Sequence, residues 1–345
     1  MGQRHKPLAA FSQQSESGVA LRFPPHSKTS FVARLQLPHG EPTPALIGVS
    51  GGRDSIALLH LLVEAGWKQL VVCHLDHGLR VESAEDARFV AKLADRFALP
   101  HVCKRLNVRT LAARNKQSLE TAAREARYAF FARTARSRRC PRLFLAHHAD
   151  DQVETFLFNL FRGTGAGGLK GMRPVSRRTI DGTALEIIRP LLGVWREEVD
   201  AFVSARGLEF REDASNADPQ FTRNRLRHEL LPLLEKGFGR EVRRAVWRAA
   251  EILGAEDELL TSLLPGHGEE GESRELEVDC LRLLPVALQR RKIYAWLRGN
   301  GVARVGYEAV EAVRALLTDH RRAKINLPGG IHARRRAGKL FLEAS

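Results

Sequence analysis

The sequence has few of the features that would cross-link it or anchor it in a membrane. Its four cysteines, at positions 73, 103, 140 and 280, form no Cys-x-x-Cys pair. This spacing argues against a disulfide framework, a zinc ribbon or a cysteine-held iron–sulfur cluster. No apolar stretch approaches the length that crosses a bilayer, and the N-terminus has no hydrophobic core like that of a signal peptide. We therefore expect a cytoplasmic protein with reduced cysteines and no membrane partner.

Negative charge is also in short supply. Forty Asp and Glu residues face 55 Lys and Arg residues, which gives a net charge of +15. The usual reason for such an excess in a soluble enzyme is a polyanionic partner, so RNA or DNA is expected. At 345 residues, 43% of them hydrophobic, the chain is long for one core and fits two or three domains.

The first half of the chain alternates two kinds of apolar pattern. Strands are predicted at 45–49, 70–74, 101–106 and 143–146, with helices at 54–65, 82–98, 118–137 and 150–161. This alternation indicates an α/β fold, a doubly wound parallel sheet with helices on both faces. Ligands of such sheets bind outside the carboxyl ends of the strands.

The second half is mainly helical. A strand is expected at 185–188 and a helix at 194–206, followed by Arg-rich helices at 222–236 and 240–263. After a Gly- and Glu-rich loop at 264–277, helices at 278–300 and 305–318 precede short strands at 323–327, 331–336 and 339–343. We predict an N-terminal extension (1–43), a nucleotide-binding catalytic domain (44–220) and a mainly helical domain (221–345).

A small-residue turn follows the first predicted strand. Its residues are Ser50, Gly51, Gly52, Arg53, Asp54 and Ser55. Glycines, hydroxyls and a helix N-terminus at this place suit a nucleotide phosphate. A carboxylate there would repel phosphate unless a cation lay between them, so Asp54 predicts Mg²⁺ bound with the nucleotide. The alternative is a tight turn with no ligand.

Polar residues also end the second and fourth strands. His74 and Asp76 come beside the turn, where nucleotide contact, a metal site with His77 and simple capping roles stay open. The segment 147–155 after the fourth strand contains Asp151 and Glu154, which share a helix face. A cluster this acidic suits a substrate amine or a second Mg²⁺.

Basic residues form two further groups. Arg124 lies one turn from Glu120 on a predicted helix, where it makes either a surface ion pair or a contact with phosphate. The glycine-rich segment 162–172 follows a helix instead of a strand, so it is interpreted as a mobile loop and not as a dinucleotide fingerprint. Arg223, Arg225 and Arg227 are expected either on a solvated face or on nucleic-acid phosphates.

Taken together, these blocks resemble the tRNA(Ile)-lysidine synthetases, a family of PP-loop ATP pyrophosphatases. The matching segments, in the family's order, are 50–55, 74–80, 147–155, 162–165, 189–192, 212–216 and 223–227. The resemblance runs from about residue 44 to the Leu-Pro-Gly-Gly turn at 327–330. Arg53 stands where many relatives carry Pro or Lys, and residues 1–43 have no clear counterpart. We also expect the chain to lack a further C-terminal domain of longer relatives.

The resemblance implies ATP-dependent ligation of free lysine to the wobble cytidine of an isoleucine tRNA. It implies that residues 50–55, with His74 and Asp76, hold ATP. It also implies that Asp54 holds Mg²⁺, that Arg124 offsets charge during adenylation, and that Asp151 and Glu154 bind lysine. The three arginines at 223, 225 and 227 would grip tRNA. Whether the protein is a homodimer stays open.

Two other functions fit part of the pattern. A tRNA cytidine thiolase would share the ATP-binding fold, but it is expected to use paired cysteines, and none is paired here. A non-catalytic nucleotide- or RNA-binding module would keep the turn at 50–55 without needing the acidic segment 147–155.

Overall fold

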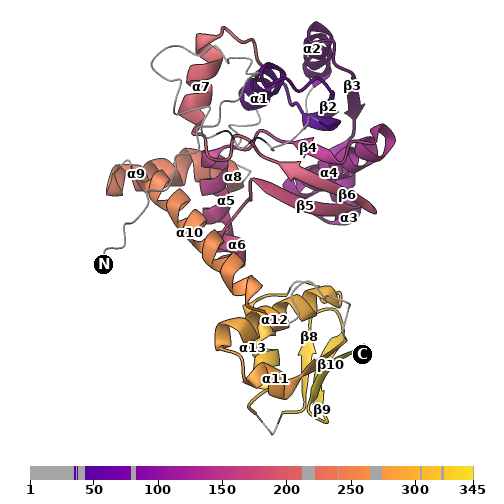
Figure 1. Cartoon of the computed structure of the whole chain (residues 1–345), viewed down its shortest axis with the longest axis vertical. Coiled ribbons are helices and arrows are strands. Elements are labelled where there is room, and N and C mark those ends of the chain that lie inside the picture. The colour runs from indigo at the N-terminus through magenta and orange to yellow at the C-terminus, as the bar shows by residue number, and fades with distance from the viewer. Residues whose placement is uncertain are drawn as a thin grey trace, which may run out of the picture. The chain divides into compact units, whose positions relative to one another are not determined.

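The computed structural model describes Leu35, Leu37 and residues 43–78, 83–211, 222–239, 241–264, 274–303, 305–319 and 322–344. Contacts among these residues divide the chain into two compact units, and most of their elements are labelled in Figure 1. Unit 1 holds the described residues up to Ala146 and those of 175–211; unit 2 holds 147–174 and the described residues from Thr222 on. Most of the expected N-terminal extension lies outside the described residues, and the three-domain division stays a prediction.

Unit 1 is built on a six-stranded sheet with the order β3-β2-β1-β4-β6-β5. All neighbours pair in parallel except β5, which is antiparallel to β6. The elements are β1 (Ala45–Gly48), α1 (Arg53–Glu64), β2 (Leu70–Asp76), α2 (Ser83–Arg96), β3 (His101–Arg105), α3 (Val108–Asn115), α4 (Leu119–Arg138), β4 (Arg142–Phe144), β5 (Val175–Ile180), β6 (Thr183–Ile188) and α7 (Arg196–Ala205).

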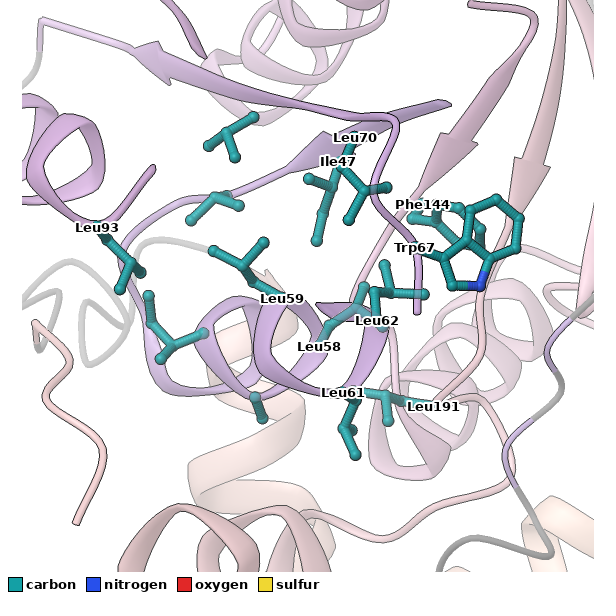
Figure 2. Close-up of a cluster of buried hydrophobic side chains, with 14 of the residues drawn as sticks. Ile47, Leu58, Leu59, Leu61, Leu62, Trp67, Leu70, Leu93, Phe144 and Leu191 are labelled. Carbon is teal, nitrogen blue, oxygen red and sulfur yellow. The ribbon is translucent and has the colours of Figure 1, made fainter. Parts of the chain in front are cut away.

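Helices cover both faces of this sheet, which confirms the expected doubly wound α/β fold. Successive strand residues point to opposite faces, so Ile47 belongs to the core beneath α1, α2 and α7 while Leu46 belongs to the core beneath α4. Figure 2 shows the first of these cores, where leucines of α1 meet Ile47 and where Trp67 lies beside Phe144. The rings of Trp67 and Phe144 meet edge to face, with their centroids 4.8 Å apart.

The edge strand β5 and the short helix α3 were not predicted from the sequence. The residues of β5 are largely exposed and polar, so they show no apolar alternation. A sequence signal was nevertheless present, because Asp181 and Gly182 join β5 to β6 with positive φ values of 48° and 71°. An Asp-Gly pair in this conformation is typical of a two-residue hairpin turn.

Gly48 lets α4 pack tightly on the end of β1. A Cβ atom at this position would lie 2.9 Å from both Leu145 Cδ2 and Phe131 Cζ. We expect Gly48→Ala to lower the free energy of unfolding by about 1–3 kcal/mol, because the core must shift to admit the methyl group. Chemical denaturation measures this change. Gly299→Ala is the control, since its Cβ would meet nothing within 4 Å; equal losses in the two variants would contradict the prediction.

Unit 2 joins a group of helices to a small antiparallel sheet with the order β7-β10-β9-β8. Its elements are α5 (Ala149–Phe161), α6 (Ala166–Leu169), α8 (Thr222–Arg225), the π-helix η3 (Leu226–Leu230), α9 (Leu231–Phe238), α10 (Val242–Ser262), β7 (Glu275–Glu277), α11 (Val278–Arg282), α12 (Val286–Gly299), α13 (Tyr307–Ala315), β8 (Lys324–Leu327), β9 (Ile331–Arg336) and β10 (Lys339–Ala344). The sheet and α11–α13 share one apolar core around Trp296 and Leu340.

The mainly helical character of this region and its terminal strands agree with the sequence analysis. Two details differ. The strand β7 lies within the segment predicted as a loop, where it pairs with β10. The helix predicted at 278–300 is two helices, because Pro285 restricts the residue before it and starts α12 as its N-cap.

Candidate functional site

The turn after β1, hereafter the phosphate loop (residues 50–55), is held by its own serines. Ser55 Oγ donates to the Gly52 carbonyl at 2.8 Å and accepts from Ser50 N at 3.2 Å. Gly51 has a φ of +92°, a backbone conformation that favours glycine. The helix α1 begins at Arg53, so its N-terminus, the positive end of the helix dipole, adjoins the loop. This arrangement suits an anion.

Arg53 and Asp54 open α1 but have different surroundings. Arg53 donates to Asp200 Oδ1 of α7 at 2.7 Å, and its guanidinium carbon lies 4.6 Å from the centroid of the Phe210 ring. Asp54 is half-buried in the first helical turn. Nucleotide contact by Arg53 stays a prediction, and the structure gives its side chain a packing role against α7 as well.

His74 and Asp76 fix the backbone beside the loop. The Nδ1 atom of buried His74 lies 2.9 Å from the Val49 carbonyl oxygen, the residue before the loop. A carbonyl only accepts, so Nδ1 carries the proton. Asp76 accepts from Gly78 N at 2.7 Å and lies 3.3 Å from Arg105 Nε. Both contacts support the positioning roles that the sequence left open; nucleotide contact stays a prediction.

The acidic segment belongs to unit 2, where it opens α5. Asp151 Oδ2 accepts from His148 N at 2.9 Å and so caps the helix. Its other oxygen, Oδ1, lies 3.2 Å from Arg227 Nη2, and Arg227 Nε donates to Glu154 Oε1 at 2.6 Å. Glu154 is buried. The three side chains form a mixed-charge group, hereafter the Asp151–Glu154–Arg227 cluster.

The two carboxyl groups of this cluster differ in proton affinity. Burial alone would raise the pKa of Asp151, but the charges of His148, His147 and Arg227 outweigh it and hold the pKa at about 2. Burial, and then the negative charge of Asp151, raises the pKa of Glu154 above its ordinary value. Asp151 is therefore the permanent anion, and Glu154 is the group that takes a proton more readily.

Arg227 lies in a π-helical turn. Leu231 N bonds to Leu226 O, five residues back, within the segment predicted as one helix at 222–236. Pro232 follows at the start of α9, and a proline provides no N–H for the preceding turn. Single π-turns are frequent at functional sites. The proline in the sequence was the signal for this interruption.

The remaining two arginines of the predicted tRNA group have other surroundings. Arg225 is exposed and lies 3.9 Å from Glu229, one turn along the chain, and Arg223 is half-buried. Contact of all three arginines with tRNA stays a prediction. The residues 79–80 and 212–216 of the matching segments lie outside the described residues.

Arg243 is a further member that the sequence analysis missed. Its Nη1 donates to Asp150 Oδ1 at 2.7 Å and its Nε donates to Glu235 Oε1 at 2.8 Å. Asp150 is buried, so the arginine offsets a charge that burial would otherwise penalise. Nothing in the sequence predicted that Arg243 of α10 would contact Asp150.

The glycine-rich segment 162–172 contains α6 and is tied to α5 and α10. Fully buried Gln152 donates from Nε2 to the carbonyls of Lys170 (2.8 Å) and Met172 (3.1 Å). It also accepts from Met172 N at 2.8 Å. Lys170 Nζ donates to Asp257 of α10 at 2.7 Å. Closure of this segment over a substrate stays a prediction.

We expect Gln152→Leu to loosen this segment, because each lost hydrogen bond contributes about 1 kcal/mol. Limited trypsin digestion measures the effect as faster cleavage after Lys170 and its basic neighbours. Gln117→Leu is the matched control, since Gln117 makes an exposed bond to Glu125 in unit 1. Unchanged cleavage of the Gln152 variant would show that other contacts hold the segment.

Arg124 lies in unit 1 on α4, apart in the chain from the cluster of unit 2. Its guanidinium carbon is 5.4 Å from the centroid of the Tyr128 ring. Tyr128 also contacts Arg178 of β5, at 5.4 Å. Of these residues, only Arg124 was predicted from the sequence to belong to the site. A role for it in offsetting phosphate charge stays a prediction.

The cysteines in the described part of the chain are free thiols. Cys73 and Cys140 are buried thiols, and Cys103 and Cys280 are exposed thiols. Across the ranges that the structure describes, no group of three or more His, Cys, Asp or Glu side chains is placed to hold a metal ion. None of the helices within those ranges is long and apolar enough to cross a membrane.

Comparison with known proteins identifies relatives of most of the chain. A family model described as a PP-loop domain matches residues 28–234, and one described as the TilS substrate binding domain matches residues 276–341. The tRNA(Ile)-lysidine synthase of Geobacter sulfurreducens is 41% identical over 82% of this chain and 61% of its own length. The enzyme of that name from Thermus thermophilus is 39% identical over 87% and 56%.

A shorter relative matches over most of both chains. The tRNA(Ile)-lysidine synthase of Thermosynechococcus vestitus is 35% identical over 84% of this chain and 83% of its own length. The chain thus spans 61% and 56% of the two longer relatives. The solved U34-tRNA thiolase NcsA from Methanococcus maripaludis aligns at 17% identity with a TM-score of 0.49, covering 62% of this chain and 73% of that one.

Proposed function

Because the chain belongs to the tRNA(Ile)-lysidine synthase family, we propose that it is a carbon–nitrogen ligase for the wobble cytidine of a minor isoleucine tRNA. The carbon-2 oxygen of the cytosine attacks the α-phosphate of ATP and pyrophosphate leaves. The ε-amine of free lysine then attacks carbon 2, the carbon–oxygen bond breaks and AMP leaves. The product is lysidine.

The phosphate loop is proposed to hold ATP for the first step. Its backbone N–H groups and the hydroxyls of Ser50 and Ser55 supply donors to the phosphates. Asp54 adds a carboxylate oxygen beside hydroxyl oxygens, a donor set that suits Mg²⁺ shared with phosphate groups. Bound there, Mg²⁺ would offset the charge of the phosphates. Arg124 would stabilise the charge that develops as pyrophosphate departs.

The Asp151–Glu154–Arg227 cluster is the observation that carries the lysine assignment. Free lysine has one carboxylate and two ammonium groups, so its recognition requires both signs of charge. The cluster places one guanidinium within 3.2 Å of two carboxyl groups, a geometry in which Arg227 could take the carboxylate while Asp151 and Glu154 take an ammonium group. A purely basic RNA-contacting surface would not need the buried Glu154.

Glu154 is also the better candidate for the base that removes a proton from the attacking amine. An amine must be neutral to attack carbon 2, and a carboxylate with a raised pKa is closer to the ideal for that transfer than one with a pKa near 2. Glu154, with its raised pKa, therefore suits the role of the base, and Asp151, with its low pKa, suits the role of a permanent anion. Asp151 would bind the ammonium group of lysine and also cap the start of α5.

The tRNA is proposed to contact the basic side chains Arg223 and Arg225, and the net charge of +15 favours such a partner. Arg227, which the sequence also assigned to tRNA, is proposed to bind lysine instead, because it pairs with Asp151 and Glu154. The second family model matches the region of the small antiparallel sheet and is described as substrate binding. A cytoplasmic location and a homodimer stay proposals of the sequence analysis.

Incorporation of labelled lysine into isoleucine tRNA transcripts tests the proposal. Label should appear only with ATP and with a transcript that has cytidine at the wobble position, with one AMP formed for each lysine joined. Pyrophosphate release without lysine incorporation would contradict the ligase assignment and leave the thiolase open. Binding of ATP and tRNA without any turnover would identify a binding module.

A further inference from the structure

Three arginines of unit 1 converge on the side chain of Tyr128. The guanidinium carbons of Arg124 on α4 and Arg178 on β5 each lie 5.4 Å from the ring centroid. Arg189, which follows β6, shares a side-chain hydrogen bond with Tyr128. Arg189 Nη1 also donates to Ser176 Oγ of β5 at 3.0 Å. We call these four side chains the Tyr128 arginine group.

Stacking explains part of this arrangement. A cation over an aromatic face contributes about 0.5–1 kcal/mol at an exposed site, which accounts for Arg124 and Arg178 as packing partners of the ring. Stacking does not account for Arg189, which is only 4% exposed. Burial lowers the pKa of Arg189, Tyr128 raises it, and the charges of Arg178 and Arg124 lower it to a smaller extent. The three guanidinium groups place many N–H donors near one ring, an arrangement that suits an anion with several oxygen acceptors.

The group lies at a place where this sheet is expected to bind ligands. Arg189 directly follows β6, and Ser176 pairs with Ile187 near the carboxyl end of that strand. The phosphate loop follows β1, which is joined to β6 through β4 in the same parallel set. Carboxyl ends of parallel strands meet at one edge of a sheet. Arg189 and the phosphate loop therefore share the carboxyl edge within unit 1, whereas Arg178 lies opposite Leu185, farther from that edge.

We propose that Arg124, Arg178 and Arg189, gathered around Tyr128, form a binding site for a phosphate group. Guanidinium forks match phosphate oxygens in geometry and stay charged at any ordinary pH. Tyr128 keeps the cations apart from the apolar core beneath α4 and orients Arg189. The site depends on the proposed function only for the identity of the phosphate, which is either that of the nucleotide or that of the tRNA backbone.

Arg178→Gln tests the site, and Arg177→Gln is its matched control. Both residues lie on β5 and lose the same charge, but neighbouring strand residues point to opposite faces. The side chain of Arg177 is 87% exposed and lies 3.5 Å from Glu186. The probes are inorganic pyrophosphate, ATP and an isoleucine tRNA transcript, with affinities measured by calorimetry at two salt concentrations. We expect Arg178→Gln to weaken binding of at least one probe about tenfold, as for a lost charge-assisted hydrogen bond, and Arg177→Gln to have little effect.

The pattern of losses identifies the phosphate. Weaker pyrophosphate and ATP binding assigns the site to the nucleotide. If only tRNA binding weakens, and the slope of the logarithm of the binding constant against the logarithm of the salt concentration falls by about one, the site binds a phosphate of the tRNA backbone. Tyr128→Phe, which keeps the ring and removes the oxygen that bonds Arg189, should weaken the same probe to a smaller extent. Equal affinities of the Arg178 and Arg177 variants for all three probes would overturn the proposal.

These binding measurements need neither lysine nor turnover. If the chain binds phosphate through Arg178 but incorporates no lysine, the site stands and the ligase function fails. If lysine is incorporated and the Arg178 variant binds every probe normally, the function stands and the site fails. Thermal unfolding of each variant verifies that its fold is intact.

Discussion

Asp54→Asn is expected to lower the rate of pyrophosphate release by about 10³-fold while leaving tRNA affinity nearly unchanged. The asparagine keeps the size of the side chain and one oxygen but loses the charge that would attract Mg²⁺ to the phosphates, and losing one such electrostatic contact costs a factor of this order. Asp54 lies in the first turn of α1 beside the phosphate loop. Release of pyrophosphate from ATP in the presence of tRNA measures the rate.

Asp95→Asn provides the comparison for this loss. Asp95 lies on α2, its side chain is 71% exposed, and its only described ion pair is a 3.7 Å contact with His101. The same chemical change there should leave the rate close to that of the unmodified protein. If Asp54→Asn retains most of its activity at saturating ATP, the phosphate loop does not use this carboxylate for the chemical step.

Glu154→Gln is expected to slow lysine transfer on the order of 10²-fold, because truncating one member of a buried charged pair costs several kcal/mol. The buried carboxylate bonds Arg227 at 2.6 Å, and the amide that replaces it neither balances that charge nor takes a proton from the amine. Adenylation should continue, so adenylated tRNA should accumulate before lysine is added. Rapid quenching and separation of the two tRNA products measures this accumulation.

Glu311→Gln is the matched control, since it also removes a carboxylate held by arginines of unit 2. Glu311 accepts from Arg290 at 2.7 Å and from Arg314 at 2.8 Å. Arg227→Lys adds a second test, because a lysine keeps the charge but not the fork that reaches both carboxyl groups. If Glu154→Gln slowed adenylation and lysine transfer equally, the proposal that Glu154 acts only in lysine transfer would be wrong.

The pH dependence of lysine use follows from the same cluster. Burial and the charge of Asp151 raise the pKa of Glu154 above the ordinary value of 4.5. As the pH falls through this raised pKa, Glu154 becomes neutral and the KM for lysine should rise, while Asp151, with a pKa of about 2, stays ionised. Glu154→Gln should flatten the profile in this range. A profile that is equally steep in the variant would assign the titration to another group.

The same shifts have opposite effects on stability. The raised pKa of Glu154 contributes stability below the ordinary value of 4.5, and this contribution is lost as the pH rises through the raised pKa. The lowered pKa of Asp151 contributes stability above the ordinary value of 3.8, and this contribution is lost as the pH falls towards about 2. Unfolding measured across this range should therefore show acid sensitivity from Asp151 and the opposite trend from Glu154.

Much of unit 1 follows from local patterns in the sequence. The apolar runs that begin at Ala45 and Leu70 became β1 and β2, and the turn between β1 and α1 became the phosphate loop. These features depend on neighbouring residues, because side-chain alternation and helical periodicity decide which face of an element is apolar. The polar strand β5 lacked that pattern and was missed, although the Asp-Gly turn before β6 was a usable signal.

The sequence by itself determined the order of the chemical groups: a phosphate loop, an acidic helix start and a basic segment near Arg227. Only the tertiary structure decided that Arg227 pairs with Glu154, 73 residues away in the chain, and not with solvent. It also decided that Arg178 and Arg189 share the ring of Tyr128 with Arg124. Local periodicity encodes backbone conformation and buried faces, whereas the pairing of distant charges depends on how helices and strands pack and on local distortions such as the π-turn at Leu226–Leu230.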